Sequence, residues 1–150
     1  MAIGNTVKGM IAGFVATILL SGLMLTKEMM GLMPQLDVIG MLTTMMGVSS
    51  PVAGWITHFA IGTIAWGGLF AILEANLPGD SYWQRGIVFG IGAWVLMMVA
   101  VMPMAGAGMF GLGLGVMAPV MTFMLHAIFG AVLGGEYGLQ QPNAVIHASH

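Results

Sequence analysis

Four long apolar runs, separated by shorter polar or glycine- and proline-rich segments, dominate the pattern of the chain. They cover residues 7–30, 52–73, 86–104 and 119–133. Each is close to the ~20 residues that a helix needs to cross the hydrocarbon core of a bilayer. Lipid offers the backbone no hydrogen-bonding partner, so a spanning segment satisfies its own amides and carbonyls as a helix. The pattern therefore predicts an all-α membrane protein with four transmembrane helices.

Composition supports this fold class. Hydrophobic residues make up 59% of the 150 residues and charged residues 5%, against about 25% charged in ordinary globular domains. We expect a single transmembrane domain over 1–138 and a polar C-terminal tail over 139–150. Cysteine is absent, which excludes disulfides and thiolate chemistry. The net charge of −2 gives no reason to expect a nucleic-acid partner.

The second and fourth apolar runs share one skeleton. Both read Pro, six residues, His, three residues, Gly, four residues, Gly, and the pairs are Pro51/Pro119, His58/His126, Gly62/Gly130 and Gly67/Gly135. A matching start precedes the other two runs, where Lys8-Gly9 with Gly13 corresponds to Arg85-Gly86 with Gly90. This predicts two duplicated two-helix units, about 5–75 and 81–138.

Small residues recur every fourth position in the first run. Gly9, Gly13, Thr17 and Ser21 would form one ridge along a helix. Ridges of small side chains allow helix backbones to approach closely in lipid, where association depends on packing. We therefore expect this ridge to be a helix-packing surface.

The segments that follow the first and third runs are too long for turns. Asp37 precedes a short apolar stretch and would cap a helix running to about residue 47. The equivalent part of the second half, 104–118, is glycine-rich. Both segments are too short to span a bilayer. We expect short interfacial helices there, on the outer side of the membrane.

The three cations of the chain set the expected orientation. Lys8 and Arg85 begin the first and third runs, and Lys27 lies at the other end of the first run. Cytoplasmic ends of membrane helices carry the excess of Lys and Arg. This majority predicts that both termini face the cytoplasm.

His58 and His126 are the candidate site. Each lies seven residues into its helix, ~10 Å at a rise of 1.5 Å per residue. Gly62 and Gly130 follow one turn later and would leave clearance for a flat macrocycle. Neutral imidazoles bind haem and metals, so His58 and His126 would be the axial ligands of a haem b, or ligands of a metal.

A structural role is the alternative, and we favour it. Each neutral histidine would then hydrogen-bond a carbonyl or a threonine across the bundle, and the glycine would admit a neighbouring helix. In that case no cofactor is expected.

Seventeen methionines raise the question of copper, because thioethers suit Cu(I). Methionine is also an adaptable filler of apolar surfaces that meet partners, and this is the interpretation that we favour. His147 and His150 in the tail are weaker metal candidates.

The [Lys/Arg]-Gly-x3-Gly start, the Met-Pro and Asp within 33–37 and the Pro-x6-His-x3-Gly core resemble an uncharacterised family of small four-helix bacterial integral membrane proteins. The resemblance covers residues 5–138. It implies a multi-pass protein of the bacterial cytoplasmic (inner) membrane, and no activity.

No nucleophile paired with a base is evident within the apolar runs, so an enzyme is not expected. The first hypothesis is a non-catalytic accessory subunit that packs against a larger membrane complex, such as a respiratory or other redox assembly, or against copies of itself. A small haem- or metal-binding protein that uses His58 and His126 is the alternative. An oligomeric transporter or channel component is a weaker one, since few buried polar groups offer a solute path.

Overall fold

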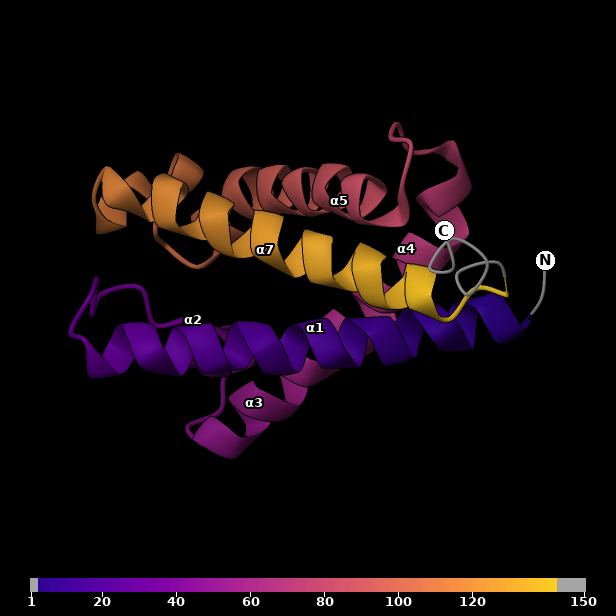
Figure 1. The fold of residues 1–150 in the computed structure, drawn as a ribbon. Coiled ribbons are helices and arrows are strands. Elements are labelled where there is room, and N and C mark those ends of the chain that lie inside the picture. Colours follow the sequence, from indigo (N-terminus) through magenta and orange to yellow (C-terminus); the bar gives the residue numbers. More distant parts are fainter. Residues whose placement is uncertain (1–2, 143–150) are drawn as a thin grey trace.

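The computed structural model describes residues 3–142 and is built from helices that run up and down (Figure 1). Four of its helical segments are long and apolar enough to cross a membrane: Gly4–Met29, Pro51–Asn76, Tyr82–Met104 and Met117–Leu139. They coincide with the four apolar runs, so the prediction of four helices of spanning length is confirmed.

The first and last spans are continuous helices, α1 (Ile3–Met29) and α7 (Met117–Leu139). The second and third are interrupted by wider π turns. The second consists of α3 (Pro51–Ala60), the π turn η1 (Ile61–Gly67), α4 (Gly68–Leu73) and the 3-10 turn η2 (Glu74–Asn76). The third consists of α5 (Tyr82–Leu96), the π turn η3 (Met97–Val101) and α6 (Met102–Met104). Pro103, which has no N–H to donate, follows the second of these π turns.

Glycines bring the spans together in pairs. A Cβ added to Gly13 of α1 would lie 2.5 Å from the carbonyl oxygen of Gly62 and 2.9 Å from the Cα of Gly67. In the other pair, Gly86 of α5 is in the same kind of backbone contact with Gly130 and Gly134 of α7. The glycine ridge of the first run is thus a packing surface, as predicted.

The two glycine pairs differ in register by one residue. Gly62 and Gly67 lie five residues apart across η1, whereas Gly130 and Gly134 lie four apart in regular helix. A π turn accommodates one residue more than an α turn. The structural counterpart of Gly67 is therefore Gly134 rather than Gly135, beside which an added Cβ would meet no atom within 4 Å.

Two apolar clusters form the interior. One is aromatic and lies nearer the start of α1; its edge-to-face ring pairs include Phe70–Phe89 and Phe70–Tyr137, each with centroids 5.4 Å apart. The other contains Leu36, Met98, Met102 and Ala107, with further methionines packed around it. Buried Met98 and Met102 fit the role of filler that we favoured for methionine.

The methionine-rich end of the bundle carries two short elements, α2 (Val38–Met45) and the 3-10 segment η4 (Met109–Leu114). The carboxylate of Asp37 accepts a hydrogen bond from the N–H of Gly40 at 2.8 Å, which confirms the predicted cap. The side-chain amide of Gln35, which precedes α2, donates to the carbonyl of Leu114 in η4 at 3.0 Å. This hydrogen bond joins the two segments.

Polar contacts join neighbouring segments at both ends of the bundle. At one end the Gln140 amide donates to the carbonyl of Lys8 at 3.1 Å, and Arg85 pairs with Glu74 at 3.0 Å. At the other end Lys27 is buried, and its ammonium donates to the carbonyls of Leu32, Met33 and Leu36 at 3.3, 3.2 and 3.0 Å. The cations thus lie at the two ends as the sequence predicted. Of the tail, His147 and His150 lie outside the described residues.

Candidate ligand-binding cavity

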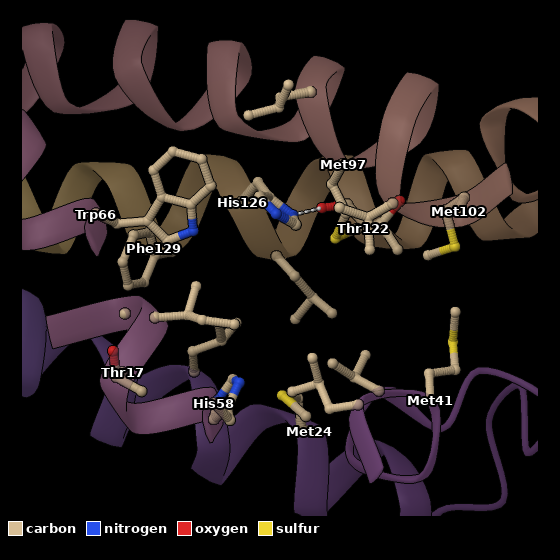
Figure 2. A pocket seen from close by; sticks show the side chains of 18 of the residues that line it. Thr17, Met24, Met41, His58, Trp66, Met97, Met102, Thr122, His126 and Phe129 are labelled. Carbon is tan, nitrogen blue, oxygen red and sulfur yellow. Dashed lines mark hydrogen bonds between the residues drawn. The ribbon is translucent and has the colours of Figure 1, made fainter. Parts of the chain in front are cut away.

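A cavity of about 170 Å³ lies inside the bundle, toward its methionine-rich half (Figure 2). All four spans and α2 contribute to its wall. Its lining is mostly apolar, and the polar side chains among the lining residues are Thr17, His58, Trp66, Thr122 and His126. An apolar cavity with a few convergent polar groups is the usual form of a small-molecule site.

His58 enters the cavity from α3, on the side formed by α1, α2 and α3 (Figure 2). The residue is 9% exposed, and its Nε2 atom has no hydrogen-bond partner within the part of the chain that the structure describes. The imidazole packs against the ring of Trp55 in a T-shaped arrangement, with ring centroids 5.8 Å apart. Leaving a buried polar atom unpaired costs free energy, ~1–3 kcal/mol. A ligand that bonded this nitrogen would recover it.

His126 faces the cavity from α7, on the opposite side (Figure 2). Its Nδ1 atom lies 2.8 Å from the carbonyl oxygen of Thr122. A carbonyl oxygen only accepts hydrogen bonds, so Nδ1 carries the proton and Nε2 of the neutral ring keeps a lone pair. This is the arrangement in which a histidine binds a metal or accepts a hydrogen bond from a ligand.

Thr122 is itself held in place by its neighbours. Its hydroxyl donates to the carbonyl of Ala118 at 2.7 Å and accepts from the indole N–H of Trp94 at 3.0 Å. The second bond crosses from α5 to α7. The residue whose carbonyl orients His126 is therefore also joined to the neighbouring span through its hydroxyl.

The structure brings both predicted histidines to one cavity. Neither bonds across the bundle in the way that the structural alternative required: His126 bonds a carbonyl of its own helix, and Nε2 of His58 bonds none of the described residues. The geometry therefore leaves a ring nitrogen of each histidine available on opposite walls.

Gly62 and Gly130 do not leave the open space for a macrocycle that the sequence predicted. Gly62 lines the cavity, but the space beside it is occupied by Thr17 of α1. Gly130 does not line the cavity, and its free side meets Gly86 and Gly90 of α5. Both glycines admit a neighbouring helix, because a side chain there would collide with it.

The sequence was compared with the models of known protein families. The family model described as "Family of unknown function (DUF6789)" matches residues 3–146. The chain belongs to this family. Neither the curated proteins nor the solved structures contain a match. Membership confirms the resemblance to an uncharacterised family and assigns no activity to the chain.

Several lining residues were not predicted from the sequence. Trp66 follows His58 by eight residues and Thr122 precedes His126 by four, so each lies near its histidine's helix face. That spacing is the signal that could have found them. Met24, Met97 and Met102 supply part of the remaining wall.

The polar groups that line this cavity are two imidazoles, one indole and two threonine hydroxyls. Its lining contains no carboxylate, and residues 3–142 contain no group of three or more His, Asp or Glu side chains able to hold a metal ion. Histidine nitrogens, an indole N–H and thioethers suit a neutral, mostly apolar ligand with few polar atoms.

Proposed function

We propose that this protein is an integral membrane protein that binds one small, mostly apolar ligand between His58 and His126. The observation that carries the proposal is that both histidines, from different spans, line one apolar cavity and each has a ring nitrogen without a hydrogen bond to the described residues. Ionisable side chains within membrane helices are rare and commonly mark functional sites.

The size of the cavity selects among ligands. An apolar cavity of about 150 Å³ in another protein holds a benzene molecule, and this one measures about 170 Å³. A single ring therefore fits the bundle as it stands. The tetrapyrrole of haem b is much larger, so its binding would require the spans to separate. A metal held by His126 and methionine thioethers would have to be a soft one such as Cu(I).

A role as a non-catalytic accessory subunit is the second candidate, and it is compatible with ligand binding. Methionines are exposed around the end that carries α2 and η4, with Met29 at 88% and Met104 at 74%. Flexible thioether side chains suit surfaces that pack against partners. We propose that this surface, which comprises Met29, Met30, Met45, Met46, Met104 and Met109, meets a larger membrane complex or a second copy.

Location and origin complete the proposal. Lys8 and Arg85 lie at the same end of the bundle, and by the distribution of Lys and Arg we place that end in the cytoplasm of a bacterial cell, with the spans in its cytoplasmic membrane. We further propose that the two halves arose by duplication. Support comes from the paired contacts Gly13–Gly62 and Gly90–Gly130.

The test is to extract the protein from its own membrane in mild detergent, record its absorption spectrum and identify by mass spectrometry the small molecules and proteins that accompany it. We expect one small molecule per chain, lost in His58→Leu and His126→Leu. The matched controls Ile56→Ala and Met124→Ala change exposed residues of the same helices outside the cavity and should retain it.

Three outcomes decide between the candidates. A chain that carries no small molecule, or variants that retain it, would contradict the binding function. A Soret band lost with either histidine would identify the ligand as haem. Purification as a free monomer without companions would contradict the accessory role.

A further inference from the structure

The polar atoms of the cavity narrow the class of ligand. We infer that the cavity receives the headgroup of a lipid-soluble quinol, a flat six-membered ring with oxygen at opposite edges, while its apolar tail lies in the bilayer. This inference rests on the proposed function and specifies its ligand.

The hydrogen-bonding groups of the cavity match a ring that carries hydroxyls. His126 holds its proton on Nδ1 toward Thr122, so Nε2 accepts a hydrogen bond and does not donate one. Trp66 offers only an N–H donor, and Figure 2 shows its indole nitrogen on the cavity side. His58 adds a buried ring nitrogen without a partner among the described residues. A hydroxyl both donates and accepts, so a ring with a hydroxyl at each end satisfies this set.

The wall of the cavity also suits a flat ring. Trp66 and Phe129 lie together at one end of the cavity, and Met41 and Met102 lie at the other (Figure 2). Aromatic rings and thioethers both pack favourably against a flat ring. The volume of about 170 Å³ holds such a ring and leaves no room for a long tail.

The tail of the ligand needs an exit to the bilayer. Trp66 of η1 contacts Phe89 of α5, with ring centroids 5.8 Å apart. Toward the N-terminal end of the same span, α3 diverges from α5 (Figure 1). Ile61 and Leu96 line the cavity from these two spans and also reach the outer surface, 36% and 53% exposed. We place the opening between them, at a depth where the bundle borders lipid.

The oxidation state of the ligand follows from the tautomer. A quinone carbonyl only accepts hydrogen bonds and so leaves the lone pair of His126 unpaired, whereas a quinol hydroxyl donates to it. The quinol form should therefore bind more tightly than the quinone form, by about tenfold, the effect of a single buried hydrogen bond.

The test compares three probes that share a decyl tail: a decyl-substituted benzoquinol, the corresponding benzoquinone and decylbenzene. Binding to the full chain in detergent is measured by titration calorimetry. We expect one quinol per chain, bound about tenfold more tightly than the quinone and still more tightly than decylbenzene. His126→Leu should remove the preference for the quinol over the quinone.

A matched pair of variants tests the opening without removing a polar atom from the cavity. Leu96→Trp should weaken quinol binding by about tenfold or more by narrowing the mouth. Val95→Trp alters its exposed neighbour, which does not line the cavity, and should leave binding unchanged.

The failures are distinguishable. If decylbenzene binds as tightly as the quinol and only the cavity variants weaken it, the quinol inference is wrong and the binding function stands. If the quinone binds as tightly as the quinol, or His126→Leu leaves the preference intact, the inference is also overturned. If no probe binds and the chain carries no molecule from its membrane, the proposed function fails with it.

Discussion

Nδ1 of His126 lies 2.8 Å from the carbonyl oxygen of Thr122, one turn earlier in α7. The bond fixes the tautomer of the ring and leaves the Nε2 lone pair for a ligand. The two ring nitrogens therefore have separate roles: Nδ1 makes a hydrogen bond within α7, and Nε2 is free to contact a ligand. A variant can therefore keep the hydrogen bond within α7 and remove the contact with the ligand.

His126→Asn should retain the fold and lose the ligand. An asparagine amide nitrogen occupies nearly the position of Nδ1 and still donates to the carbonyl of Thr122, but nothing replaces Nε2. We expect a free energy of unfolding within about 1 kcal/mol of the wild type, since the local hydrogen bond persists, and ligand binding as weak as in His126→Leu. Unfolding in mixed micelles and the calorimetric titration measure the two. An asparagine variant that binds as tightly as the wild type would contradict the role of Nε2.

Gly130→Ala should destabilise the bundle strongly. The added Cβ would collide with the carbonyl oxygen of Gly86 on α5, and overpacking of this kind costs about 1–3 kcal/mol. Gly92→Ala is the matched control on α5, because a Cβ there meets no atom within 4 Å. It should be neutral or stabilising by up to about 1 kcal/mol, the helix propensity of alanine over glycine. Equal effects of the two substitutions on the free energy of unfolding would rule out the close contact.

The transmembrane helices and the cap of the short helix could be predicted from the sequence. Four apolar runs of spanning length specify four helices, and Asp37 before a short apolar stretch specifies its capped helix, because both signals are local. The π turns are not local in this sense. Nothing in the sequence of 61–67 marks a wider turn. The one-residue difference between the spans is seen only in the structure, in η1 and in the contact of Gly134 rather than Gly135 with α5.

The candidate site was predictable to a similar extent. The repeated Pro-x6-His skeleton selected His58 and His126, and both line the cavity. The same skeleton predicted that Gly62 and Gly130 would leave clearance for a macrocycle, but both glycines face a neighbouring helix. Sequence spacing shows which residues share a helix face but not which neighbour that face meets. The divergence of α3 from α5 is a tertiary feature with no counterpart in the pattern of residues.

Lys27→Met should loosen the loop between α1 and α2. The lysine is 7% exposed, and its ammonium serves the carbonyls of Leu32, Met33 and Leu36. Methionine fills similar space but donates no hydrogen bond, so these carbonyls lose their partner at a cost of about 1–3 kcal/mol in the free energy of unfolding.

Lys8→Met is the control for this substitution. Lys8 makes one long side-chain bond, 3.4 Å to Gln141, at the other end of the bundle, so its loss should cost less than about 1 kcal/mol. If both lysine variants unfold like the wild type, the carbonyl cluster does not hold the loop.

The central claim, that His58 and His126 face one cavity, is tested most directly by cross-linking. The chain has no cysteine, so the double variant His58→Cys/His126→Cys places thiols at these two positions alone. A short bifunctional thiol reagent should join them within one chain, and added ligand should slow the reaction. The control pair His58→Cys/Met124→Cys uses an exposed residue outside the cavity and should react singly at each thiol. Failure of the histidine-position pair to cross-link, or equal cross-linking of the control pair, would contradict the account.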